Sequence, residues 1–241
     1  MRYRKSIWMC LAVLFFFSAV SAAHAGLYWE SLMVRKGVPE GMPPNMPKAA
    51  LEQFNKTEVV KNFFTEDAMR TETADSVMIM NFEAMTMYNL NPVEKTYTVT
   101  DLKARPHGQE MDGMMKGMTD GMKVTATDET REIAGFMCRK YKVKMPMGEG
   151  IYWVTRDVKE YKTLRKMGKK MEEMMDKSPV LRQMNMAALM DQLDGFPVRT
   201  EMDFMGMTTE TTLRQIEEKP LKPALFEVPA GYKKVVMAGS M

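Results

Sequence analysis

The chain has 241 residues, with 34 basic and 31 acidic side chains. Three of the basic residues, Arg2, Arg4 and Lys5, belong to the N-terminal 25 residues, which contain no acidic ones, so 31 of each sign remain. This balance gives no electrostatic reason to expect nucleic acid as a partner. Beyond residue 25 the only histidine is His107 and the only cysteine is Cys138. That excludes an internal disulfide and many catalytic and zinc constellations, so we expect no enzyme.

The first 25 residues have the pattern of a secretory signal peptide. A positive start is followed by an apolar run from Ile7 to Val20 and by Ala23-His24-Ala25, whose small residues flank a bulky one. We expect cleavage before Gly26 and a periplasmic or secreted protein. Cys10 lies within the apolar run without the small residues that precede a lipidated cysteine. No later stretch approaches the roughly 20 apolar residues needed to cross a bilayer.

Residues 26–241 fall within the usual span of a single domain. Four prolines and two glycines between residues 37 and 47 predict a loop or tether. Residues 105–122 form an insertion rich in methionine and glycine. We therefore expect one domain that carries these two irregular segments.

Strands are expected where apolar and polar residues alternate over short runs. In Lys95–Thr100, lysine, tyrosine and valine share one face and three threonines the other, and a turn is expected just before it at Asn89–Pro92. The predicted strands are Leu27–Lys36, Val59–Phe64, Ala68–Thr73, Val77–Phe82, Ala84–Tyr88, Lys95–Thr100, Lys123–Thr127, Phe136–Met145, Ile151–Thr155, Val198–Phe204 and Thr208–Ile216.

Helices are expected between the two groups of strands. An apolar stripe recurs every three or four residues from Val158 to Met175. Ser178 before Pro179 predicts the start of a second helix, with Leu181, Met184, Ala188 and Leu193 on its inner face and Gly195 at its end. The order of elements predicts an α+β fold, a curved antiparallel sheet with two or three helices against its concave face.

Four segments resemble a known family. They are EDAMRTETADSVMIMNFEAMTMYNLNPVEKTYTVT (66–100), IAGFMCRKYKV (133–143), GFPVRTEMDF (195–204) and LFEVPAGYKKV (225–235). In this order they resemble a family of exported bacterial domains of unknown function (number 4412), which is similar in layout to LolA/LppX-type periplasmic lipoprotein carriers and lipid-binding proteins. The resemblance implies a half-open β-barrel with an apolar cavity for acyl chains and no catalytic residues. It implies a lipid or a lipidated protein as partner and no cofactor.

All but two of the 30 methionines lie beyond residue 25. Methionine is unbranched and polarizable, which suits a binder of varied apolar chains. Most of these methionines are nevertheless expected to be core residues in strands, including Met78, Met80, Met85, Met87, Met202 and Met205.

The stretch EMDGMMKGMTDGMK (110–123) has a more specific pattern. At roughly 100° per residue on a helix, its methionines share an arc of about 100° with His107. These methionines are Met111, Met114, Met115, Met118 and Met122. Three glycines in the stretch cost a helix about 1 kcal/mol each relative to alanine, so we expect helix only when the segment is docked.

Three interpretations of this stretch remain open. It is a mobile lid over an apolar cavity, a Cu(I) or Ag(I) site formed by His107, Met111, Met114 and Met115, or a flexible insertion. We expect a periplasmic, non-enzymatic binder or carrier of an apolar ligand that touches the membrane surface at most transiently. A methionine-rich copper protein is the alternative. The candidate ligand-binding residues are Met111, Met114, Met115, Met118, Met122, Met171, Met175 and Met184.

Overall fold

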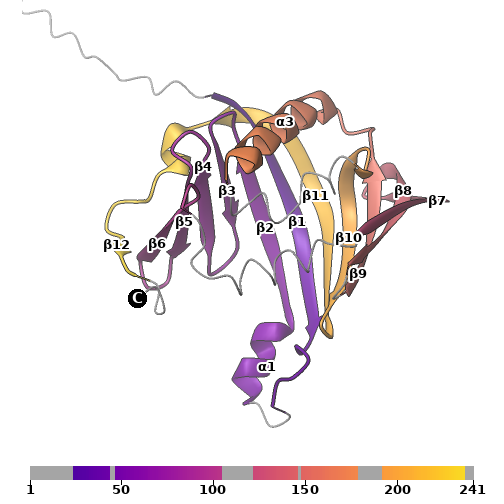
Figure 1. Ribbon diagram of the computed structural model, residues 1–241, viewed down its shortest axis with the longest axis horizontal. Helices are drawn as coiled ribbons and strands as arrows, with labels where there is room; N and C mark the ends of the chain where they lie inside the picture. Colours follow the sequence, from indigo (N-terminus) through magenta and orange to yellow (C-terminus); the bar gives the residue numbers. More distant parts are fainter. Residues whose placement is uncertain (1–23, 44–46, 105–121, 146–147, 179–191, 237–241) are drawn as a thin grey trace, which may run out of the picture.

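The computed structural model describes residues 24–43, 47–104, 122–145, 148–178 and 192–236. Their strands form one twelve-stranded sheet, in the order β12-β6-β5-β4-β3-β2-β1-β11-β10-β9-β8-β7 (Figure 1). The strands are β1 (His24–Gly37), β2 (Lys56–Phe64), β3 (Ala68–Glu72), β4 (Val77–Asn81), β5 (Thr86–Asn91), β6 (Thr96–Asp101), β7 (Lys123–Ile133), β8 (Phe136–Met145), β9 (Gly148–Thr155), β10 (Phe196–Phe204), β11 (Met207–Leu221) and β12 (Lys233–Lys234). The helices are α1 (Lys48–Phe54), α3 (Tyr161–Lys177) and a 3-10 turn, η1 (Pro223–Phe226).

The sheet is curved and does not close on itself, because β12 and β7 lie at opposite edges (Figure 1). Two meanders, β1 to β6 and β7 to β11, are joined by the long antiparallel pair of β1 and β11. Only the two-residue β12 pairs in parallel, with β6. The predicted α+β class and the curved antiparallel sheet are confirmed.

The helix count differs from the prediction. Of the described residues, α3 is the one long helix against the sheet, and α1 is a short helix at the opposite end (Figure 1). Two or three helices on the concave face are therefore not supported. The stripe from Val158 to Met175 predicted α3 correctly, whereas the second helix after Ser178 falls on residues 179–191, outside the described residues. None of the described helices is long and apolar enough to span a membrane.

Two turns include residues that were predicted to lie at the ends of strands, namely Phe82, Ala84, Met85 and Lys95. Phe82–Met85 connects β4 to β5, and Pro92–Lys95 connects β5 to β6. Each turn follows an asparagine whose side-chain oxygen accepts backbone N–H bonds, from Ala84 to Asn81 (2.7 Å) and from Val93 and Glu94 to Asn91 (3.0 Å each). An asparagine bonded to its own following backbone stabilises a turn. The predicted turn at Asn89–Pro92 was thus placed about three residues too early.

The main core lies between α3 and the sheet. Leu27, Phe64, Met80, Phe82, Met85 and Leu102 pack there with Met167 and Met174 of α3. We call this side of the sheet the helix face. On the other side, the outer face, Val77, Ile79 and Leu90 are covered by Phe226, Val228 and Tyr232 of the C-terminal tail. Arg70 fixes this tail by donating to the Leu225 carbonyl (2.9 Å).

Three polar contacts fasten α3 along its length. Thr163 hydrogen-bonds to Glu218, and Lys166 forms an ion pair with Glu66. At the end of the helix, the fully buried Ser178 donates its hydroxyl proton to the Leu102 carbonyl (2.7 Å). This last bond is the most protected from water, so it contributes more to holding the helix than the exposed pairs do.

Replacing Ser178 with alanine should lower the free energy of unfolding by about 1–3 kcal/mol, because the buried Leu102 carbonyl loses its donor. The measurement is urea denaturation followed by circular dichroism. The exposed Thr208→Ala is the control and should change stability by less than about 0.5 kcal/mol. Equal destabilisation by the two substitutions would contradict this role for Ser178.

Candidate functional site

A row of methionines crosses the helix face from strand to strand. Met69 of β3 pairs with Met80 of β4, and Met80 pairs with Met87 of β5. Directly opposite residues on neighbouring antiparallel strands point to the same face, about 5 Å apart. Phe64 of β2 pairs with Met69 and extends this row by one strand. The registers therefore produce a continuous apolar stripe across four strands.

A second set of methionines faces this row from α3. Met167, Met171 and Met174 follow one another at spacings of four and three residues, which places them on one side of the helix. Met167 and Met174 are buried, and Met171 is half-buried against the same cluster. The sheet and the helix thus meet through thioether side chains.

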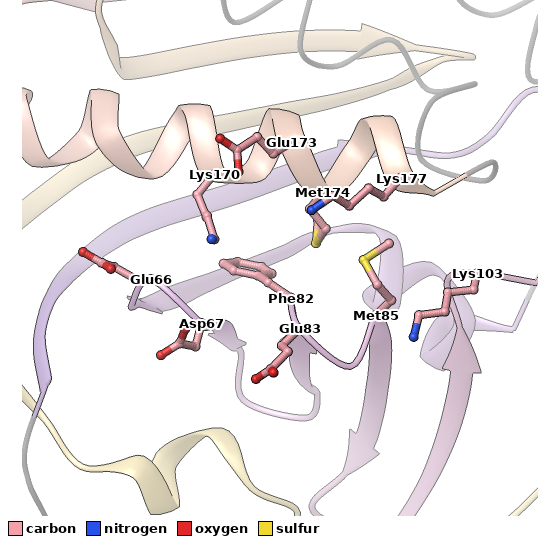
Figure 2. Close-up of a pocket in the computed structure, with 10 residues that line it drawn as sticks. All are labelled: Glu66, Asp67, Phe82, Glu83, Met85, Lys103, Lys170, Glu173, Met174 and Lys177. Atoms are coloured by element: carbon pink, nitrogen blue, oxygen red, sulfur yellow. The ribbon is translucent and has the colours of Figure 1, made fainter.

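An open pocket of about 700 Å³ lies at the edge of this contact, between α3 and the turn from β4 to β5 (Figure 2). Phe82, Met85 and Met174 form its buried apolar part. Its rim carries exposed charges of both signs, Glu66, Asp67, Glu83, Lys103, Lys170, Glu173 and Lys177. The site combines an apolar floor with a charged, water-exposed mouth.

The turn after Asn81 is what brings Phe82 and Met85 into the pocket. Met85 has a positive φ of 55°, and its carbonyl accepts a bond from the Leu102 N–H (2.9 Å). A left-handed conformation costs a non-glycine residue roughly 1–2 kcal/mol. Lys95 takes the same place and a φ of 52° in the next turn, but it is exposed. The two turns have the same backbone conformation, but only the turn after β4 has a buried side chain at this position, that of Met85.

Glu58 is a buried carboxylate on the helix face, and cationic side chains compensate its charge. Glu58 of β2 pairs across the strands with Met33 of β1, and its side chain is only 3% exposed. Arg35 forms an ion pair with Glu58, and Lys56 Nζ lies 3.0 Å from its other oxygen. A buried carboxylate with two cationic partners is charge-compensated. We interpret this group as structural.

Lys56 also reaches Asp75, at 2.8 Å. The hydrogen bond from Lys56 lowers the pKa of the Asp75 carboxyl, and its bond to Asp75 raises the pKa of the Lys56 ammonium. Because the folded pKa of Asp75 is depressed, the pair stabilises the fold at neutral pH and loses this contribution as the pH falls through that pKa. Both groups reach solvent, so the contribution is small.

The predicted site residues fall into three groups. Met171 lies in the cluster beneath α3, whereas Met122 packs against a different cluster, with Tyr141, Tyr152 and Leu193. Met175 belongs to α3, but its side chain lies outside the described residues. The others also lie outside them, namely His107, Met111, Met114, Met115, Met118 and Met184. The lid and metal interpretations of residues 105–122 thus stay predictions.

Comparison with known proteins gives the chain a family. Residues 49–232 match the model described as "Domain of unknown function (DUF4412)". The chain belongs to this family. No curated protein matches this DUF4412 member.

Solved structures that resemble it include "Structure of PNGF-II in C2 space group" (12% identity, TM-score 0.40, 87% of this chain and 30% of that one). Two others are "The complex structure of Pseudomonas aeruginosa MucA/MucB" (9%, 0.41, 88% and 58%) and "Crystal structure of MucB" (6%, 0.40, 87% and 59%). The DUF4412 chain spans less than two thirds of each of these chains.

Sequence reasoning missed Phe82, Met85 and Lys103 as site residues of this DUF4412 domain. Phe82 and Met85 were assigned to strands, where an apolar residue needs no further explanation. The signal that could have found them is the repeat of Asn81-x-x-x-Met85 and Asn91-x-x-x-Lys95, ten residues apart. The same turn carries methionine at residue 85 and lysine at residue 95. This difference indicates that Met85 packs against another part of the fold, whereas Lys95 faces solvent.

Cys138 should be unreactive in the folded protein. It is fully buried, and burial raises the pKa of its thiol to about 11, so at pH 8 roughly one thiol in a thousand is ionised. The test uses protein that begins at Gly26, in which Cys138 is the only cysteine. A chromogenic disulfide reagent should label it slowly at pH 8 and rapidly in urea. Equal rates with and without urea would contradict the buried thiol.

Proposed function

We propose that this DUF4412 protein is an exported, non-enzymatic binder or carrier of an amphipathic ligand, such as a lipid or the acyl chain of a lipidated protein. The observation that carries the proposal is the apolar surface shared by the helix face and α3, which runs from the methionine row to the floor of the pocket. We propose that the sheet acts as a half-open barrel in which the acyl chain lies against this surface.

Methionine suits such a surface for two physical reasons. Its unbranched side chain changes rotamer easily and fills gaps of irregular shape, so one surface accommodates chains of different length and saturation. Met69, Met87 and Met171 are only half-buried at the margin of the cluster. These three side chains are therefore the ones that a ligand would contact first.

The rim of the pocket supports an amphipathic ligand over a purely apolar one. Lysines and carboxylates surround the floor of Phe82, Met85 and Met174, and all of them remain in contact with water (Figure 2). A polar head group would stay hydrated there while its chain is buried. Charges of both signs would accept an anionic or a zwitterionic head.

The proposal of a non-enzymatic role draws on two features of the described residues. The buried carboxylate on the helix face, Glu58, is paired with Arg35 and Lys56 rather than with a second carboxylate. The charged residues of the pocket rim are exposed. General acid or base catalysis requires a positioned group with a pKa matched to its task, and binding makes no such demand.

Ligand extraction tests the proposal directly. The protein is purified from its native host under mild conditions, without detergent, and extracted into organic solvent for mass spectrometry. Recovery of a lipid at about one molecule per chain supports the proposal. The proposal would be wrong if the purified protein contained no lipid and bound neither a fluorescent fatty acid nor a fluorescent phospholipid.

A charge placed on the ligand surface should weaken binding. Met171→Lys puts an ammonium group on the half-buried side of α3, and desolvating it should reduce affinity for a fluorescent fatty acid at least tenfold, which is about 1.4 kcal/mol. The matched control is Met137→Lys, at a methionine that is 55% exposed on β8. Titration by fluorescence measures both, after circular dichroism has shown that both variants are folded. Equal affinities would remove α3 from the binding surface.

Export is part of the proposal and has its own test. N-terminal sequencing of the protein from the periplasmic fraction should begin at Gly26. Ala25→Arg should leave the precursor uncleaved, because signal peptidase needs a small residue at that position. Cleavage would trim His24 and Ala25, which pair with Leu221 and Pro220, from the end of β1. A wild-type protein that keeps residues 1–25 would contradict it.

A further inference from the structure

The cluster beneath α3 contains seven thioether sulfurs. Four of the methionines are buried and three half-buried, and they come from β3, β4, β5, the turn between β4 and β5, and α3. They are Met69, Met80, Met85, Met87, Met167, Met171 and Met174. Adaptability to a ligand accounts for the three half-buried methionines, but four of the seven are buried, where leucine would fill an apolar core equally well.

Two of these methionines form part of the pocket floor. Met85 and Met174 both line it and belong to the same packed cluster. Figure 2 shows their sulfur atoms turned toward one another, one from α3 and one from the turn after β4. Met85 is held in its left-handed backbone conformation by the turn, and Met174 is held by the helix. The backbones of both residues are therefore fixed, which limits the space in which their sulfurs can lie.

We propose that Met85 and Met174, with a third thioether from Met80 or Met167, bind a monovalent soft metal ion, Cu(I) or Ag(I). Thioethers are neutral, soft ligands that select such ions over Zn²⁺ or Mg²⁺. Among the residues that the structure describes, no group of three or more His, Cys, Asp or Glu side chains could hold a metal ion, which leaves harder ions without a site there.

The pocket provides the entry path that a metal site needs. Met85 and Met174 line a pocket that opens to solvent, so an ion that enters the pocket arrives at the side on which both residues lie. Met80 and Met167 are not among the residues that line the pocket, but both are buried members of the same packed cluster, so either is a candidate for the third ligand. This site is distinct from His107, Met111, Met114 and Met115, and it does not depend on the proposed ligand.

The experiment titrates the protein that begins at Gly26 with Ag(I), a redox-inert probe, by calorimetry, and with Cu(I) in competition with a chromophoric chelator. Met85→Leu/Met174→Leu should lower the affinity for both ions at least about 100-fold. Even the loss of a residue that only orients a metal ligand lowers metal affinity 10–100-fold. Methionine-to-leucine changes conserve volume and usually cost less than about 1.5 kcal/mol each, so the variant should fold.

Two further variants make the result specific. Met33→Leu/Met202→Leu removes two half-buried methionines that lie outside the cluster and should bind Ag(I) as the parent does. A variant with leucine at Met111, Met114, Met115 and Met118 should also retain binding at the pocket. Isotope labelling of methionine methyl groups identifies the ligands, because the resonances of Met85 and Met174 should shift when Ag(I) is added.

Three outcomes would overturn the site. They are no Ag(I) binding by the parent, unchanged binding by Met85→Leu/Met174→Leu, and loss of binding only in the variant of residues 111–118. The lipid proposal is separable from all three. Its own tests are the ligand extraction and the Met171→Lys titration, and neither of them changes Met85 or Met174.

Discussion

The contact between α3 and the helix face is the interaction on which the rest of the domain depends. It buries Leu27 from the first strand, Phe64 from the second and Leu102 beyond the sixth against one helix. An open sheet this large has a wide apolar face to remove from water, and burial yields roughly 25 cal/mol per Å² of apolar surface. With Ser178 bonded to the Leu102 carbonyl, the end of the helix is fixed to the same strands that shape the pocket.

This contact also explains why the site lies where it does. The turn after Asn81 projects Phe82 and Met85 toward the helix, and the free space beside them is the pocket. Elsewhere the two faces of the sheet are covered differently. The C-terminal tail covers the outer face of β4 and β5, and Arg131 and Lys140 stack on Trp153 at the other edge. The pocket beneath α3 combines buried methionines with direct access to solvent.

Much of the fold follows from local sequence pattern. Alternation predicted most of the strands, and Phe136–Met145 agrees with β8 at both ends. The spacing of Leu164 and Met171 predicted α3. Met85 and Met205 were expected to be strand residues, and this was wrong, because both occupy turns with positive φ. The steric cost of that conformation is offset by tertiary packing at Met85, and at Met205 by the pairing of β10 with β11 that the two-residue turn Met205-Gly206 connects. A single sequence shows the residue type but not this compensation.

The site was harder to predict than the fold. Met171 was identified because helical periodicity marks the inner side of α3. Its partners Met69, Met80 and Met87 come together through strand registers, and a shift of one residue would turn each of them to the outer face. Composition indicated that methionine was in excess. The strand registers in the folded structure, and not the composition, show that these methionines form one cluster.

The pairing of β1 with β11 has a consequence for how the chain folds. It joins His24 to Leu221 and Gly37 to Met207, residues about 170–200 positions apart, at the centre of the sheet. Contacts so distant in sequence must be formed after the entropy of closing a very long loop has been lost, which slows folding. The first strand cannot reach its partner until nearly the whole chain is available. The local hairpins from β2 to β6 can pair before it does, so the centre of the sheet is the part of the fold that is completed last.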